Sequence, residues 1–291
     1  MGTLKDWLQV SLDLLFNVPP DCSLCSGKIS SNHFLEYPID SLSTIINGHK
    51  ENLKIGKQDL LYIARIEADL KNKVCRECTT QIPIICGSYC EVCGRKTDQH
   101  ICNDCKGNGE RNFIYSRAAT QYSEFMQQMI HLWKYRGNRQ VGIFLESLIS
   151  HAYRRYFHSI PIDKIVPVPL HRNRLAERGF NQAEYLANAV SKCSGIPVCT
   201  HLQRVEETEK QSKKTKQDRA RSLADAFRYI EYISDDRCSD DNVFSSDKED
   251  LKNQKILIID DIYTTGTTID SCAKVLRDAG ASEVYALVLS R

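Results

Sequence analysis

Long apolar runs are absent from this chain of 291 residues. No run approaches the roughly 18 apolar residues that a membrane-spanning helix needs, so we expect no transmembrane segment. A secretory signal peptide is not expected either, because Lys5, Asp6 and Asp13 interrupt the apolar stretch over residues 4–15. The helical spacing of that stretch predicts a short amphipathic helix packed on the protein, with a membrane-surface role as the alternative.

The chain also lacks a strong excess of either charge. Its 39 Lys and Arg residues against 37 Asp and Glu residues leave a net charge of +2, which argues against a generally basic nucleic-acid binder and an acidic tail protein. Two segments depart from this balance. Residues 210–221 carry six basic residues and one acid, whereas residues 234–253 carry seven acids among Ser and Asn and predict a solvated loop.

Cysteine, in contrast, is abundant, with 13 residues in the chain. Two Cys-x-x-Cys pairs make one tetrahedral four-thiolate zinc site, so four pairs predict two structural zinc ions rather than redox pairs. Sequence order favours a compact ribbon and an outer set that closes a long loop, with Cys86 as an alternative ligand in the outer set. The compact set is Cys90, Cys93, Cys102 and Cys105, and the outer set is Cys22, Cys25, Cys75 and Cys78. Thiolate zinc and free thiols predict a reducing cytoplasm.

One segment near the end of the chain has the pattern of a sugar-phosphate site. Apolar residues 256–259 predict a buried strand that ends in Asp260 and Asp261, and helical spacing starts at Ile269. Between them lies a loop of small residues, namely Thr264, Thr265, Gly266, Thr267 and Thr268. Backbone N–H groups of such a loop and the following helix dipole bind phosphate, while the two carboxylates can accept hydrogen bonds from ribose hydroxyls. A simple helix cap would need one hydroxyl and no acid pair.

Strand and helix patterns alternate through the second half of the chain. Apolar spacing predicts helices over residues 122–135 and 141–156, a strand over 164–169, a helix through 183–190 and a strand over 284–289. This alternation is typical of a mostly parallel α/β sheet, whose ligands bind at the carboxyl ends of the strands. We expect two domains. Residues 1–110 would form an N-terminal helix and a double zinc ribbon, and residues 111–291 the α/β domain.

Two resemblances add to this interpretation. Residues 260–268 resemble the signature with which type I phosphoribosyltransferases bind PRPP, 5-phosphoribosyl-1-pyrophosphate. Residues 166–172, 178–183 and 211–227 resemble the hallmark of the ComF/GntX family, and the cysteine pairs complete its layout. The resemblance implies a type I phosphoribosyltransferase-like parallel sheet with helices on both faces, preceded by a small zinc-ribbon domain with four-cysteine sites. It also implies a link to natural competence, the uptake of DNA for transformation. Ser222 departs from the family pattern, as do the lysines after Gln211.

The implied chemistry is phosphoribosyl transfer from PRPP, with Mg²⁺ on the pyrophosphate. Asp260 and Asp261 are the candidate catalytic residues and would hold the ribose hydroxyls, directly or through the metal. The loop over residues 264–268 would clamp the 5-phosphate. Arg172 is a candidate for the pyrophosphate side, with a surface arginine as the alternative, and Arg178 and Asn181 are expected to hold loop geometry. The sequence identifies neither a general base nor the acceptor.

Other functions stay open at this level. The chain could be a non-catalytic protein that handles single-stranded DNA and retains the PRPP pocket. It could also be a scaffold whose zinc ribbons bind a partner, such as another competence or DNA-uptake protein. Residues 210–221 could close over pyrophosphate, bind nucleic-acid phosphates or form a solvated helix face. The expected location is cytoplasmic, and the alternative is a peripheral position at the inner face of the membrane.

Overall fold

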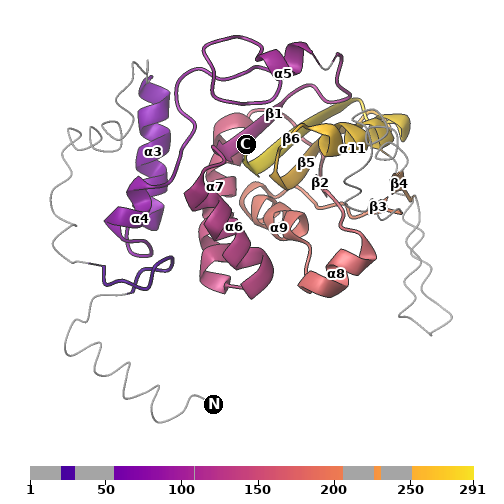
Figure 1. Cartoon of the computed structure of the whole chain (residues 1–291). Helices are drawn as coiled ribbons and strands as arrows, with labels where there is room; N and C mark the ends of the chain where they lie inside the picture. Colours follow the sequence, from indigo (N-terminus) through magenta and orange to yellow (C-terminus); the bar gives the residue numbers. More distant parts are fainter. Residues whose placement is uncertain (1–20, 30–55, 108, 206–225, 231–250) are drawn as a thin grey trace.

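The computed structural model describes residues 21–29, 56–107, 109–205, 226–230 and 251–291 (Figure 1). The predicted N-terminal helix, the basic segment over residues 210–221 and most of the acidic segment lie outside these ranges. Within them, no helix combines the length and apolar character needed to cross a bilayer.

A four-stranded parallel sheet forms the centre of the molecule, in the order β1-β6-β5-β2 (Figure 1). Strands β5 (Lys255–Ile262) and β6 (Glu283–Ser290) lie in the middle, and β1 (Ser116–Thr120) and β2 (Lys164–Pro167) form the edges. The central strands are almost continuously apolar because both faces of the sheet are covered. Residues 256–259, for example, have no exposed surface.

Helices cover both faces of the sheet, as predicted. On one face, α7 (Arg139–Tyr156) and α9 (Gln182–Ser194) pack on the strands, and α6 (Glu124–Arg136) packs on α7. Helix α11 (Thr267–Asp278) covers the other face. Alternate residues of β5 point to the two sides: Leu257 lies in the same core cluster as α7 and α9, and Ile258 in that of α11.

Several predicted elements are present in the structure, and others were not foreseen. The helices expected over residues 122–135, 141–156 and 183–190 correspond to α6, α7 and α9, and Gly137 ends α6 with a φ of 59°. The strand expected to end in the acid pair continues one residue further, through Ile262. Among the described residues from 109 onwards, the elements without a prediction are the edge strand β1, helix α8 (Arg172–Arg178) and the antiparallel pair β3 (Leu202–Arg204) and β4 (Phe227–Tyr229).

The cysteine-rich part packs directly on the sheet and its helices. Helix α3 (Lys57–Leu70) contacts α7, where Arg155 forms an ion pair with Asp59 and lies 4.4 Å above the ring of Tyr62. The short helices α4 (Arg76–Thr80) and α5 (Asn103–Lys106) each begin directly after the first cysteine of a pair and contain the second. Because both core clusters contain cysteines of this part together with residues of the sheet, the domain boundary expected at residue 110 stays a prediction.

Candidate functional site

The acid pair lies at the carboxyl end of the central strand β5. The Oδ1 atom of Asp260 accepts a hydrogen bond of 2.8 Å from the backbone N–H of Asp261. Removal of the carboxyl from water and the neighbouring Asp261 charge raise the pKa of Asp260 to about 8, although Lys134 and Arg204 act in the opposite direction. The strand therefore presents two carboxyls with different environments at the edge where parallel sheets bind ligands.

Lys134 of α6 completes this acid pair. Its ammonium forms an ion pair with Asp261, and the two side chains are only 12% and 14% exposed. This lysine lies far from the acids along the chain, so no local pattern links it to them. In the structure it belongs to the candidate site, where it neutralises one of two adjacent carboxylates.

This ion pair leads to a first prediction. Lys134→Gln should destabilise the ligand-free protein by about 1–3 kcal/mol, because it leaves the Asp261 carboxylate partly buried without its cation. The double variant with Asp261→Asn should recover most of that loss, since neither charge then lacks its partner. Chemical denaturation of the wild type, both single variants and the double variant measures this coupling. Strictly additive losses would show that the two side chains do not stabilise each other.

The threonine segment over residues 264–268, here called the phosphate loop, leads from β5 into α11. Its last two residues, Thr267 and Thr268, already belong to the helix, which begins two residues earlier than expected. Thr264 and Thr265 are exposed, and the Oγ1 atoms of Thr265 and Thr267 lie 2.8 Å apart. Gly266 precedes the helix with a φ of 80°, and a Cβ atom there would overlap the ring of Tyr263. Hydroxyls and the first amides of a 12-residue helix thus converge on one exposed loop, which is the arrangement that binds phosphate.

Contacts from the segment after the compact cysteine set hold this loop from outside. Arg111 donates a hydrogen bond of 3.2 Å to the carbonyl oxygen of Thr265. The backbone N–H of Asn112 donates one of 2.8 Å to Asp270 in the first turn of α11. The loop is therefore positioned by residues outside the β5–α11 unit.

The predicted residues after β2 lie at the same edge of the sheet, because Pro167 pairs in register with Ile259 of β5. Arg172 is exposed and begins α8, a position compatible with either of its predicted roles. Asn181 donates to the carbonyl oxygen of Val168 and caps α9, with distances of 3.1 Å for both hydrogen bonds. Arg178 donates a hydrogen bond of 3.0 Å to the side chain of Gln182. Arg178 and Asn181 therefore hold the geometry of the loop before α9, as expected.

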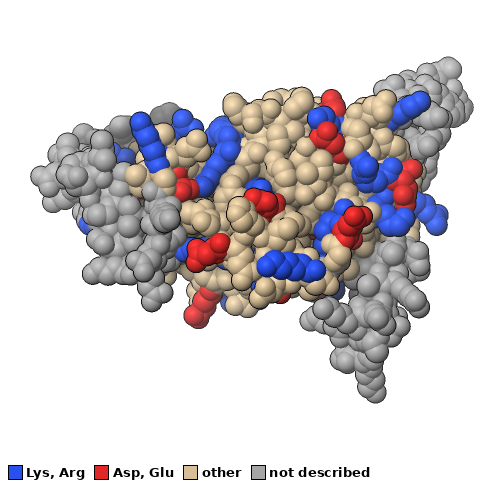
Figure 2. All heavy atoms as spheres, turned by 90° about the horizontal axis from the view of Figure 1, so that it is seen from above, with Lys and Arg blue, Asp and Glu red and all other residues tan. Residues whose placement is uncertain are grey.

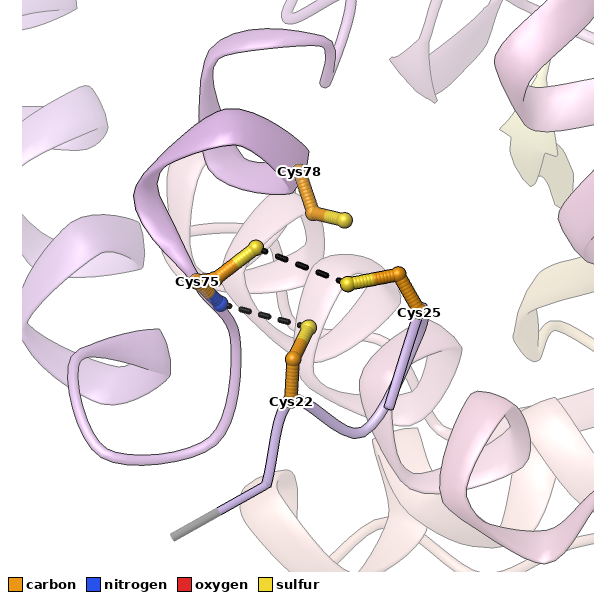
Figure 3. A group of neighbouring side chains, drawn as sticks. All are labelled: Cys22, Cys25, Cys75 and Cys78. Carbon is orange, nitrogen blue, oxygen red and sulfur yellow. Dashed lines mark hydrogen bonds between the residues drawn. The ribbon is translucent and has the colours of Figure 1, made fainter. Parts of the chain in front are cut away.

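Both predicted cysteine sets are assembled in the structure. In each set the four sulfur atoms lie within 4.8 Å of one another (Figure 3 for the outer set). The sulfurs of Cys25 and Cys75, and likewise those of Cys93 and Cys102, are 3.7 Å apart. A tetrahedral zinc ion with Zn–S bonds of ~2.3 Å requires sulfur–sulfur edges of ~3.8 Å, so both sets could hold zinc.

The two sets repeat one local structure, which the sequence did not reveal beyond the cysteine pairs. Each has a small antiparallel hairpin, closed by the bridges Asp21↔Lys28 and Tyr89↔Lys96. Each also has a cysteine, Cys75 or Cys102, that precedes a short helix and donates its backbone N–H to the first cysteine of the set at 3.3 Å.

This hydrogen bonding favours the thiolate form of the first cysteine in each set, the form that zinc binds. Burial acts to raise the pKa of Cys90, but the backbone amides of Cys102, Cys93 and Val92 lower it to about 7. Cys86, the alternative ligand, belongs to neither set among the described residues. Burial raises its pKa to about 11, and the nearby Asp59 carboxylate acts in the same direction.

Comparisons with known proteins identify a domain and several relatives. The model of the phosphoribosyl transferase domain matches residues 176–291, which include the acid pair and the phosphate loop. The chain is 29% identical to competence protein ComFC of Bacillus subtilis strain 168, with 80% of this chain and 90% of that protein covered. It is 27% identical to competence protein F of Haemophilus influenzae, with 76% and 91% covered, and 25% identical to DNA utilization protein YhgH of Escherichia coli K12, with 72% and 94% covered.

Proposed function

Since the chain belongs to the ComF family of competence and DNA-utilization proteins with a phosphoribosyl transferase domain, we propose that it binds PRPP together with Mg²⁺ at the carboxyl edge of its sheet. The observation that carries this proposal is the shared position of the acid pair and the phosphate loop. Both lie at the end of β5, and the loop opens directly into α11.

Each part of the site suits one part of the ligand. Asp260 and Asp261 accept hydrogen bonds from the ribose hydroxyls, and the phosphate loop with the N-terminus of α11 takes the 5-phosphate. Arg172, which begins α8 after the neighbouring strand β2, would contact the pyrophosphate. Mg²⁺ bound with the ligand would neutralise charge on the pyrophosphate, and carboxylate oxygens are ligands that suit it.

The corresponding reaction is transfer of the phosphoribosyl group to an acceptor, in which the bond from the anomeric carbon to pyrophosphate breaks. Negative charge then grows on pyrophosphate and positive character on the ribose ring. Cations near the leaving group and the acid pair near the ring would stabilise this distribution. The protein would act in a reducing cytoplasm, where thiolate ligands persist.

Isothermal titration tests the binding step. The zinc-loaded full chain should bind PRPP in the presence of Mg²⁺, with weaker binding of ribose 5-phosphate, which lacks the pyrophosphate. A screen of acceptors for pyrophosphate release then tests the transfer step. A correctly folded protein that ignores PRPP, ribose 5-phosphate and nucleotides in the presence of Mg²⁺ would contradict the proposal.

Single-stranded DNA is the second candidate ligand, favoured by the basic segment over residues 210–221 and by relatives named for competence and DNA utilization. On the face shown in Figure 2, acidic and basic side chains of the described residues are interspersed around a broad uncharged area. That face therefore offers no continuous basic track, and the basic segment is the better candidate for phosphate contacts.

Salt dependence tests this candidate. Replacing Lys210, Lys213, Lys214 and Lys216 with Gln should reduce the slope of log K against log salt concentration by about 3, at ~0.7 for each phosphate contact on single strands. Lys106→Gln with Lys192→Gln, at positions elsewhere on the protein, should leave the slope unchanged. An unaltered slope in the fourfold variant would place any DNA surface elsewhere. If neither PRPP nor DNA binds, partner binding by the zinc ribbons is left as the function.

A further inference from the structure

We propose that the compact cysteine set, Cys90, Cys93, Cys102 and Cys105, holds the phosphate loop in place through Arg291, when zinc occupies the set. Arg291 would then be a positioning residue for the ligand site. The inference rests on the proposed function only in assigning the loop to phosphate. The link between the cysteine set and the loop is a property of the protein itself.

Arg291 bridges the two features with one guanidinium group. Its Nη2 donates a hydrogen bond of 3.2 Å to the sulfur of Cys93. Its Nη1 donates to the carbonyl oxygen of Thr264, the first residue of the loop, and lies 3.4 Å from that of Tyr263. A planar guanidinium can make both contacts at once in a fixed geometry, which a lysine ammonium on its flexible stem cannot reproduce.

Backbone hydrogen bonds and a ring contact hold Arg291 in its position. Its backbone N–H donates to Thr120 at the end of β1 at 3.0 Å, and its carbonyl oxygen accepts from Tyr122 at 2.8 Å. The guanidinium carbon lies 4.2 Å from the centroid of the Tyr263 ring. Backbone pairing and ring stacking therefore limit the motion of the side chain, so a contact with the loop restricts the loop as well.

Tyr263 carries this restriction to the centre of the loop. Its ring is buried, with 3% of the residue exposed, and packs edge-on against Phe113 at 6.5 Å. The same ring occupies the space beside Gly266, where a Cβ atom cannot fit. Arg291 thus holds the carbonyl oxygens of Tyr263 and Thr264, and Tyr263 supports the turn at Gly266.

A zinc ion bound to the compact set would add an electrostatic attraction between the thiolates and the guanidinium of Arg291. Four thiolates around Zn²⁺ carry a net charge of −2, which the nearby guanidinium partly compensates. Loss of the metal would free the Cys93 side chain from the cluster, so its sulfur would no longer fix the guanidinium of Arg291 that holds Thr264. Loop order and zinc retention at this set should therefore be coupled in both directions, as linkage requires.

Hydrogen exchange of the zinc-loaded full chain tests the effect on the loop without any phosphosugar. Arg291→Met should speed amide exchange in the peptide covering residues 263–271 by about tenfold, the equivalent of one charge-assisted hydrogen bond. Arg291→Lys should restore part of the protection. Arg95→Met is the matched control, because Arg95 forms an ion pair of 2.8 Å with Asp104 on the same ribbon and should leave the loop unchanged.

Zinc release tests the opposite direction of the coupling. With excess chelator, Arg291→Met should release one of two zinc equivalents several-fold faster than the wild type, while release of the other, at the outer cysteine set, keeps its rate and serves as an internal control. Unchanged loop exchange or unchanged zinc release in this variant would overturn the proposal. Equal acceleration of both equivalents would also overturn it, since that result indicates general destabilisation. These outcomes are independent of whether PRPP binds.

Discussion

Replacing Asp260 and Asp261 with Asn should weaken PRPP binding at least about a hundredfold while leaving the fold intact. Each carboxylate that no longer accepts a hydrogen bond from a ribose hydroxyl removes roughly 1.5–3 kcal/mol of binding free energy. The fold should survive because both side chains lie at the carboxyl end of β5 rather than in its apolar middle. Titration calorimetry with Mg²⁺ present measures the affinity, and circular dichroism checks the fold.

The single variant Asp260→Asn separates a binding role from a structural one. The pKa of Asp260 is about 8 in the folded protein against an ordinary value of 3.8, because burial and Asp261 disfavour its charged form. The unfolded chain therefore releases this proton near pH 4 and the folded chain near pH 8. As a result, the free energy of unfolding should fall as pH rises between these values.

An asparagine at position 260 does not ionise, so it avoids the free-energy cost of a buried charge at high pH. Asp260→Asn should therefore raise the melting temperature at pH 8 by several degrees, remove part of its decline between pH 5 and pH 8, and still weaken PRPP binding. The control is Asp163→Asn. Asp163 directly precedes β2, at the amino end of the strands and away from the candidate site, so this variant should leave PRPP affinity unchanged. A loss of both stability and binding in Asp260→Asn would mark this carboxyl as structural.

Replacing Cys90 and Cys93 with Ser should remove one of two zinc equivalents and unfold the compact ribbon. A four-thiolate site contributes an apparent ~10–16 kcal/mol of zinc binding free energy in small zinc modules, and this energy supports their folding. The ribbon has little regular secondary structure of its own, since its helix α5 has four residues. Metal analysis and limited proteolysis of the purified protein measure the two effects.

Cys86→Ser provides the comparison for the zinc prediction, because Cys86 is buried but belongs to neither cysteine set among the described residues. This variant should keep both zinc equivalents. An unchanged metal content after loss of Cys90 and Cys93 would contradict the assignment of the compact set, whereas loss of zinc from Cys86→Ser would place that residue among the ligands.

Contiguous patterns in the chain predicted much of the site. The strand, acid pair, loop and α11 follow one another within residues 255–278, so each element positions the next. The cysteine sets were predictable for a related reason: Cys-x-x-Cys spacing brings two ligands together locally, and zinc requires two such pairs. Residues at predicted helix positions such as Ile269 and Leu276 are buried as their spacing indicated.

Short elements with weak local signals were not predictable. Strand β1 has the sequence Ser-Arg-Ala-Ala-Thr, which contains few strand-favouring residues, and it is a strand because it pairs with β6. Helix α8 has seven residues and buries none of them, so it shows no apolar periodicity. The common structure of the two cysteine sets was hidden because residues 26–74 separate the halves of the outer set.

The sequence by itself determined which chemical groups are present and which of them act as local units, because neighbours along a strand, loop or knuckle are neighbours in space. Only the tertiary structure decided which distant charges meet. Lys134 reaches Asp261 because α6 ends beside the carboxyl edge of the sheet, and Arg291 reaches both Cys93 and Thr264 because β6 lies next to β5. Ion pairs and hydrogen bonds depend on distance in space, and no local pattern encodes that distance.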